Sequence, residues 1–429
     1  MKKKYILNAN IVDPANSLNE KGGLIIDEKG NIEAIGKKVN KSNIPTKETF
    51  IDVKGKHLFP GIIDMRVFVG EPGFEYKENF KSLSQAALSG GVTSVVTMPN
   101  TAPIIDNVSM VDFIKRRGRD KSKINIFPSA SLTKNTEGKI MTEFGLLQKK
   151  GIVAFTDGLK AVQNSRLMSR IMKSSNDLKT LIMQHAEDIN LSKDGLVNEG
   201  IISTKLGLQG ISDLAEKIIV ERDLTLLEEY KCRYHISQIS SSKSAELIKQ
   251  KKKYLNFSCG VSINNLSLNE NDIGDFKTFL KLSPPLRTEQ DRISLIEALN
   301  DNTIDVIVSD HKPEDEEQKR LTFAQSATGA SGIETLLSLA LELYHNGSVN
   351  LETIIAALTF NPAKILKINK GNLKIGNAGD FSIVDINEPW VVKKENLLSK
   401  SKNTSIENKK LQGKVKTTFI GGELLFETR

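Results

Sequence analysis

Short apolar runs alternate with amphipathic stretches through the middle of the chain. Eight runs have the length and the β-branched content of buried strands, and they lie at residues 61–65, 94–98, 124–129, 152–156, 181–185, 233–238, 255–259 and 304–310. Helical periodicity lies between them, for example at 82–89, 165–174 and 214–231. Eight strand–helix units predict an α/β protein with a (β/α)8 barrel of the TIM type, whose functional side chains lie at the carboxyl ends of the strands.

A doubly wound open sheet is the alternative for the same alternation of strands and helices. That fold places a glycine-rich, phosphate-binding turn after its first strand. The segment after residues 61–65 has no such turn, so the pattern favours the barrel.

The two ends of the chain have a different pattern, of short strands separated by turn signals. These strands are predicted at 5–11, 23–26, 32–35 and 49–53, and again at 380–385, 414–420 and 423–426. We expect residues 1–58 and 372–429 to form one small β domain, and residues 59–371 to form the barrel.

Composition excludes several classes of protein. The net charge is +8, but the lysines are spread along the chain without interleaved aromatic residues, so we expect no nucleic-acid partner. No run of 18 apolar residues is present, and we therefore expect no membrane span. Two cysteines, Cys232 and Cys259, are too few for a disulfide framework, which favours a reducing cytoplasm.

Two histidines are placed at the predicted strand ends, where a barrel carries its chemistry. His185 ends the fifth strand, and His235 ends the sixth. Neutral imidazoles on adjacent barrel strands can share one metal ion, whereas a lone histidine more often has a structural hydrogen-bonding role. Asp157 ends the fourth strand and is a third candidate ligand, with a helix cap or a turn as its alternative role.

Two further polar residues follow apolar strands. Asp310 ends the eighth strand, where its carboxylate is placed to act as a general base; a buried ion pair is the alternative. Asn100 closes the second strand with an amide that both donates and accepts hydrogen bonds, as ligand binding or loop capping requires.

The segment after the first strand, residues 64–73, carries Arg66 and Phe68. Neither side chain binds a divalent metal, because the guanidinium stays protonated and the benzyl group has no lone pair.

The chain resembles the dihydroorotases, the type I branch of the cyclic amidohydrolases, over almost its whole length. The resemblance is carried by PGIIDM (60–65), EPG (71–73), GGVTSVVTMPNTAP (90–103), AFTDG (154–158), QHAED (184–188), YHIS (234–237), SPPLR (283–287), SDH (309–311), GASGIETLL (329–337) and NPAKIL (361–366). It implies a (β/α)8 barrel with a small β-sandwich from both termini, and a zinc-dependent hydrolysis of a cyclic amide.

The resemblance also implies which parts of the zinc site this chain keeps. Arg66 and Phe68 stand where the family has its first pair of histidine ligands, so one of the two zinc sites is missing. The ligands of the second site fall on Asp157, His185 and His235, and the general base falls on Asp310. We therefore expect one zinc ion per chain.

The family's substrate-binding residues are largely replaced. Its carboxylate-binding arginine falls on Gly70, its helper histidine on Glu314 and an asparagine on Ser283, while Asn100 persists. We expect Arg66 to lie near Asp310 or Asp157 and to bind the substrate carboxylate in place of the missing arginine.

Three hypotheses follow for function. The first is a one-metal enzyme of pyrimidine biosynthesis that interconverts dihydroorotate and N-carbamoyl-aspartate. The second is a non-catalytic scaffold for aspartate transcarbamoylase, as the resemblance implies for relatives without the histidine pair. The third is a hydantoinase-like hydrolase of a neutral cyclic amide. A homodimer is expected by analogy with the family.

Overall fold

The computed structural model describes residues 2–45 and 49–428. Eight parallel strands form the barrel predicted from the sequence, in the order β15–β14–β13–β10–β9–β8–β7–β6. Their bounds are β6 (Ile62–Val67), β7 (Val92–Thr97), β8 (Asn125–Ala130), β9 (Ala154–Phe155), β10 (Leu181–Gln184), β13 (Arg233–Ile239), β14 (Ser258–Ser262) and β15 (Val306–Val308). The (β/α)8 prediction is therefore confirmed.

The first and last strands meet just beyond β15. Val67 and His311 form a parallel bridge, and the Phe68 amide donates a 2.9 Å hydrogen bond to the His311 carbonyl. This contact joins the two edges of the sheet at the carboxyl end of the barrel, where we expected the functional residues.

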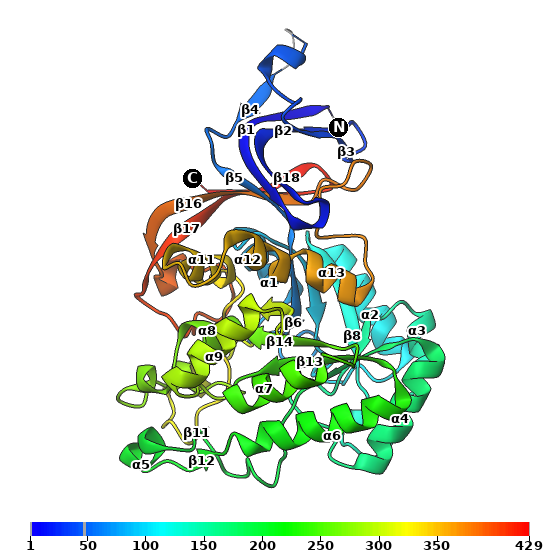
Figure 1. Ribbon diagram of the computed structural model, residues 1–429, viewed down its shortest axis with the longest axis vertical. Helices are drawn as coiled ribbons and strands as arrows, with labels where there is room; N and C mark the ends of the chain where they lie inside the picture. Colours follow the sequence, from blue (N-terminus) through cyan, green and yellow to red (C-terminus); the bar gives the residue numbers. More distant parts are fainter. Residues whose placement is uncertain (1, 46–48, 429) are drawn as a thin grey trace.

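Helices surround the barrel (Figure 1). They are α1 (Phe80–Ser89), α2 (Val108–Lys121), α3 (Phe144–Lys149), α4 (Ser165–Leu178), α5 (Ile201–Leu206), α6 (Leu214–Tyr230), α7 (Ser242–Lys251), α8 (Ile263–Ser267), α9 (Glu289–Asn300), α10 (Glu316–Arg320), α11 (Leu336–His345), α12 (Leu351–Leu358) and α13 (Phe360–Leu366). The short strands β11 (Val197–Asn198) and β12 (Gly210–Ile211) pair with each other outside the barrel.

Helix α4 illustrates why these segments are helical. The Asn164 side chain accepts a hydrogen bond from the Leu167 amide and so caps the first turn. Met168, Ile171 and Met172 recur at helical spacing and are all buried. Packing of this face holds α4 against the barrel.

Both termini contribute to one further sheet, in the order β18–β17–β16–β5–β1–β2–β3, with β4 paired to β1. Its strands are β1 (Lys4–Asp13), β2 (Leu18–Ile26), β3 (Ile32–Gly36), β4 (Phe50–Asp52), β5 (His57–Pro60), β16 (Phe381–Val391), β17 (Lys410–Ile420) and β18 (Glu423–Glu427). Figure 1 shows this sheet at one end of the molecule, next to helices α1, α11 and α12, with the N- and C-termini close to it.

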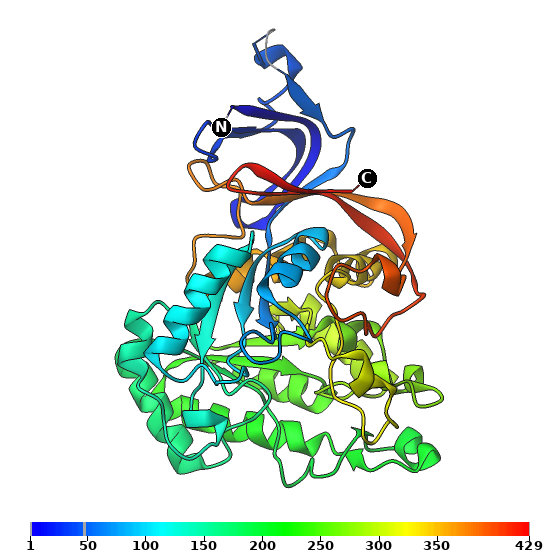
Figure 2. The same cartoon turned by 180° about the vertical axis from the view of Figure 1, so that it is seen from behind.

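The connection between β16 and β17, residues 392–409, leaves the terminal sheet and packs against the barrel; we call it the strap. Ser401 Oγ donates a 2.7 Å hydrogen bond to the Lys77 carbonyl, and Ser405 Oγ donates one of 2.7 Å to Asn264. Figure 2 shows the strap as the orange-red loop that descends from the terminal sheet. It connects the small sheet to the loops around the carboxyl end of the barrel.

The barrel interior is apolar on the side of the amino ends of the strands, away from the candidate site. Ile63, Met65, Val96, Leu181 and Met183 belong to one buried cluster with Val306 and Val308. Because side chains alternate along a strand, Leu181 and Met183 point inward, and so does His185, two residues later.

Among the described residues, the helices are too short or too polar to cross a membrane.

Candidate active site

Arg66 and Asp310 form a buried ion pair at the carboxyl end of the barrel. Arg66 Nε donates a 2.9 Å hydrogen bond to Asp310 Oδ1, and Nη1 donates one of 3.1 Å to the Gly158 carbonyl. Nη2 has no hydrogen-bond partner within the described residues. The guanidinium also lies 5.4 Å from the ring centre of Phe68. The expectation that Arg66 lies near Asp310 is therefore confirmed.

A local irregularity brings Arg66 into this position. The pairing register of β6 with β7 shifts between Asp64 and Val67, and such a shift redirects the side chains of the bulged strand. Arg66 is thereby fully buried, although a guanidinium is charged at every ordinary pH. Its charge is compensated by Asp310, which is 7% exposed.

Asp310 has an unusual backbone and an unusual environment. Its φ is +52°, in the left-handed region that aspartate and asparagine tolerate better than most residues. Burial raises the pKa of its carboxyl, while the charge and the hydrogen bond of Arg66 oppose that rise. Asp310 thus holds a proton at a higher pH than an exposed aspartate does.

His185 follows β10 and points into the same end of the barrel. Its Nε2 lies 3.1 Å from Glu187 Oε2, and its Nδ1 has no partner among the described residues. Burial would raise the pKa of Glu187, but the hydrogen bond and the charge of His185 dominate and lower it to about 2. Glu187 was not among the predicted site residues, and its spacing of two residues from His185 is the only signal for it in the sequence.

His235 does not lie at the end of its strand, and that expectation was wrong. It is the third residue of β13 and pairs in register with Met183 of β10. His185 is two residues beyond Met183, so His235 lies one layer deeper, by about 7 Å along the strand. The strand pattern of 233–238 shows which residues face inward but does not show how deep each one lies.

The surroundings of His235 keep it neutral. Burial lowers its pKa to about 3, with smaller contributions from the charges of Lys252 and Arg66. His235 Nδ1 lies 2.8 Å from Ser258 Oγ, and Nε2 has no partner among the described residues.

Gln238, rather than His235, comes near the carboxyl end of β13. It donates a 2.9 Å hydrogen bond from Nε2 to the Ser283 carbonyl, and its Oε1 has no partner among the described residues. Sequence analysis did not single out this glutamine, because an amide inside a strand carries no distinctive pattern.

The carboxylate of Asp157 is held by a neighbouring loop. It accepts hydrogen bonds of 3.0 Å from the Thr133 amide and of 2.6 Å from Thr133 Oγ1. Burial raises its pKa to about 6 against these hydrogen bonds. Asn100 Nδ2 donates a 3.1 Å hydrogen bond to the Asp157 carbonyl, and Asn100 Oδ1 has no partner within the described chain.

The expected zinc ligands do not assemble in this arrangement. His185 Nδ1 and His235 Nε2 are both without partners, but they lie in different layers, and Asp157 is bound to Thr133. No three histidine, cysteine, aspartate or glutamate side chains of the described residues group as a metal site. The donor set therefore does not fit the single zinc ion, and we derive no reaction step through a metal.

The replaced substrate contacts have structural explanations. Gly70 has a φ of +75°, and a Cβ there would approach the Phe74 carbonyl oxygen to 2.7 Å, so a larger residue requires a different loop. Glu314 is 3% exposed and forms ion pairs with Lys77 and Lys312. Its charge is compensated by these two lysines, so it does not leave an unpaired negative charge at this position.

Comparisons with known proteins agree with this fold. Residues 55–244 match the model of a family described as dihydro-orotase-like. A dihydroorotase of Syntrophus aciditrophicus is 38% identical over 426 residues, covering 99% of both chains. One of Ehrlichia chaffeensis is 41% identical over 425 residues, covering 98% of this chain and 94% of the relative.

Solved structures show the same architecture. An L-hydantoinase from Arthrobacter aurescens superposes with a TM-score of 0.87 at 22% identity, covering 100% of this chain and 96% of that one. A D-hydantoinase gives 0.84 at 21% identity, covering 99% and 95%. The fold is thus that of the hydantoinases, and the full-length identity to the curated relatives shows that this chain belongs to the dihydroorotase family.

Proposed function

We propose that this chain is a dihydroorotase-type hydrolase of pyrimidine biosynthesis, which interconverts dihydroorotate and N-carbamoyl-aspartate. The observation that carries the proposal is the Arg66–Asp310 pair at the carboxyl end of the barrel. It places a proton acceptor and a cation together at the end where enzymes of this fold act. Full-length relatives named dihydroorotase support the substrate class.

Asp310 is the proposed general base. In ring opening, the oxygen of a water molecule attacks the ring carbonyl carbon and the ring C–N bond breaks. Asp310 takes a proton from the water and returns it to the leaving ring nitrogen, so Asp310 itself ends unprotonated. The second water proton is released to solvent when the new carboxyl group ionises, and ring closure takes one proton up again. The reverse reaction closes the ring with loss of water.

Arg66 is the proposed partner of the substrate carboxylate. Its Nη2 has no partner among the described residues, so it keeps one donor for a ligand while Nε holds Asp310. A charge-assisted hydrogen bond of this kind contributes roughly 1.5–3 kcal/mol. The unpartnered Oδ1 of Asn100 is a second candidate contact, as an acceptor for a ring N–H.

One zinc ion per chain, held by Asp157, His185 and His235, is what the family resemblance implies. The two histidines do offer free ring nitrogens, but these lie in different layers of the barrel, so the three side chains as arranged here do not form one zinc site. A cytoplasmic homodimer is proposed on family analogy, and the two buried free cysteines are compatible with a reducing compartment.

A second candidate function is favoured by the burial of the same end of the barrel. Arg66, Asp310 and His185 are 0%, 7% and 1% exposed. A closed, charge-compensated interior is what a non-catalytic scaffold for aspartate transcarbamoylase requires. In that case the partner would bind the outside of the barrel.

One experiment separates the candidates. Purified protein is assayed for dihydroorotate hydrolysis, with hydantoin as a neutral cyclic amide, and is then mixed with aspartate transcarbamoylase and analysed by size-exclusion chromatography. Turnover of dihydroorotate supports the enzyme. No turnover together with a stable complex would transfer the proposal to the scaffold, and turnover of hydantoin alone would identify the neutral-substrate hydrolase.

A further inference from the structure

A cavity of 560 Å³ lies at the end of the barrel opposite the candidate active site. Its walls include Leu181 and Arg233, the first residues of β10 and β13, and Ser258, the first residue of β14. Lys364 of α13 and Lys367 just beyond it complete one side. Cavities of this size hold small organic ligands in many proteins.

The cavity is lined by four cations, Lys231, Arg233, Lys364 and Lys367, and by one carboxylate, that of Asp305. Asp305 is already engaged, because it accepts hydrogen bonds of 2.6 Å from Lys252 Nζ and of 2.7 Å from the Cys259 amide. The lining therefore presents an excess of positive charge to the cavity.

None of the four lining cations comes within salt-bridge distance of a carboxylate in residues 2–45 and 49–428, although the charge of Lys364 acts on the nearby Asp305 and opposes the rise of its pKa. Arg233 donates only to main-chain carbonyls, those of Lys179 and Ile365. Burial lowers the pKa of Arg233, with no acidic neighbour to oppose that shift. A bound anion would supply the missing counter-charge.

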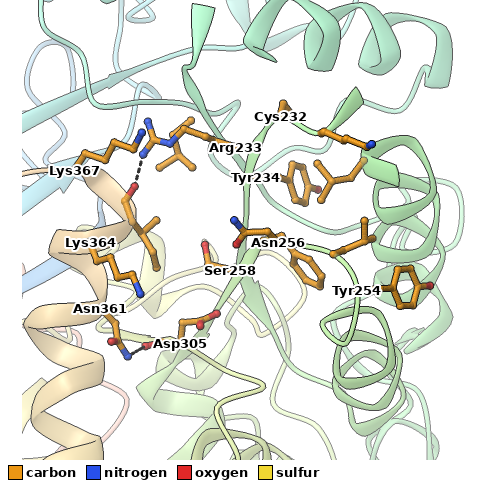
Figure 3. A pocket seen from close by; sticks show the side chains of 16 residues that line it. Cys232, Arg233, Tyr234, Tyr254, Asn256, Ser258, Asp305, Asn361, Lys364 and Lys367 are labelled. Atoms are coloured by element: carbon orange, nitrogen blue, oxygen red, sulfur yellow. Dashed lines mark hydrogen bonds between the residues drawn. The ribbon is translucent and has the colours of Figure 1, made fainter. Parts of the chain in front are cut away.

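Figure 3 shows how these groups are arranged. Arg233, Lys364 and Lys367 lie on one side of the space, and Asn256 turns its amide toward it from the other side. One wall is thus cationic, and the other offers a neutral hydrogen-bonding group of the kind that binds hydroxyl groups.

We propose that this cavity, which we call the basal cavity, binds a small organic phosphate such as a sugar phosphate. Arg233, Lys364 and Lys367 bind the phosphate group, and Asn256 binds the hydroxyl groups of the organic part. The basal cavity is separate from the candidate active site, so the proposal does not depend on the proposed reaction.

A hydrogen bond connects the basal cavity with the barrel interior. Ser258 lines the cavity, and its Oγ lies 2.8 Å from Nδ1 of His235. A phosphate oxygen that accepts a hydrogen bond from Ser258 changes the partner of His235, whose ring lies one layer below His185. Ligand binding in the basal cavity therefore changes the hydrogen bonding of His235 inside the barrel.

Calorimetric titration of the full chain tests the binding. Inorganic phosphate and ribose 5-phosphate are the probes, and ribose is the ligand control. We expect both phosphates to bind at millimolar concentration or below, and more weakly as salt is added. Ribose should not bind. An absence of phosphate binding to the wild-type protein would overturn the proposal.

Exposed lysines supply the variant and its matched control. The pair Lys364→Gln and Lys367→Gln should weaken phosphate binding at least tenfold without affecting folding, because both side chains are on the surface. The pair Lys393→Gln and Lys394→Gln removes the same charge from the strap and should leave binding unchanged. Equal losses in the two pairs would mean unspecific attraction and would refute the site.

Nuclear magnetic resonance of ¹⁵N-labelled histidine tests the connection. Ribose 5-phosphate should shift the His235 ring signals, which are assigned by their loss in His235→Gln. The Ser258→Ala protein should still bind the ligand but show a much smaller shift. A His235 signal that does not respond to bound ligand would contradict the connection, while the titration alone decides on the site.

Discussion

Arg66 and Asp310 are paired across 244 residues of sequence, from the first strand of the barrel to the end of the last. The ion pair links the side chains of the first and last strand segments. It lies beside the Val67–His311 bridge, which links the main chains of the same two segments. A guanidinium and a carboxylate thus lie where the family resemblance implies metal-bound chemistry. Changes at Arg66 and at Asp310 therefore test the stability of the fold and the proposed reaction in separate experiments.

Arg66→Met should destabilise the fold strongly. The variant leaves the Asp310 carboxylate buried without its cation, and breaking one partner of a buried pair costs about 3–5 kcal/mol. Urea denaturation measures the change in the free energy of unfolding. Arg66→Lys is the matched control, since it keeps the charge and should lose less.

The double variant Arg66→Met with Asp310→Asn should be more stable than the sum of the two single losses predicts, because no unpaired charge remains. Strictly additive losses would show that the two side chains do not interact.

Asp310→Asn should abolish dihydroorotate hydrolysis while the protein stays folded. Asparagine keeps the shape and tolerates the φ of +52°, but an amide does not accept the proton of the attacking water. Steady-state kinetics and circular dichroism measure the two effects.

Asp310→Ala separates the backbone from the chemistry at the same position. It should be equally inactive and also less stable than the asparagine variant, by about 1 kcal/mol, because alanine has a larger cost in the left-handed region. Activity that survives in Asp310→Asn would disprove the general-base role.

Glu187 should make stability depend on pH in the acid range. Its pKa is about 2 in the folded protein and about 4.3 when unfolded, so the folded state favours the charged form. The stabilisation is present above pH 4.3 and is lost as the pH falls toward 2, by roughly 3 kcal/mol in all.

Urea denaturation at a series of pH values between 5 and 2 measures this loss. In Glu187→Gln, the free energy of unfolding should no longer show this part of its dependence on pH. A slope that is unchanged in the variant would show that the His185–Glu187 pair does not form.

Zinc should bind the wild-type protein in less than one equivalent per chain, because the two free histidine nitrogens lie in different layers of the barrel. Gln238→His places an imidazole near the carboxyl end of β13 and should raise zinc affinity at least tenfold. Elemental analysis after dialysis measures the content.

His345→Gln, which changes a histidine on α11 far from the barrel strands, is the control for the zinc measurement and should have no effect. One full equivalent in the wild-type protein that is lost in His185→Ala would show that the ligands assemble after all.

The barrel was predictable because its strands are continuous apolar runs with turns between them. Seven of the eight predicted runs cover at least two thirds of their strands, whereas the run at 255–259 overlaps β14 (Ser258–Ser262) only at its end. Leu255 and Phe257 are apolar because they pack against the core outside the sheet. A buried loop segment therefore shows the same apolar pattern in the sequence as a buried strand.

The site was less predictable, because its contacts depend on how deep each side chain lies in the barrel and on loops that are far away in the sequence. His235 faces inward as its strand pattern indicates, but sequence does not give its layer. The hydrogen bonds of Asp157 come from Thr133, 24 residues earlier and on another loop. The strap carries mostly polar residues, and those of its residues that contact the barrel include the buried polar side chains of Ser399, Ser401 and Asn403. No apolar pattern in the sequence therefore marks its packing.

The strap also has a consequence for the order of events during synthesis. Ser401 bonds to a loop made 324 residues earlier, and β17 and β18 come after the strap in the chain. On the ribosome, the last barrel strand and α13 are made before the segment that ties the first barrel loop to the terminal sheet. In a nascent chain stalled before the strap, the loop that contains Lys77 should still be cleaved by proteases. Once the strap, β17 and β18 have been made, the same loop should be protected.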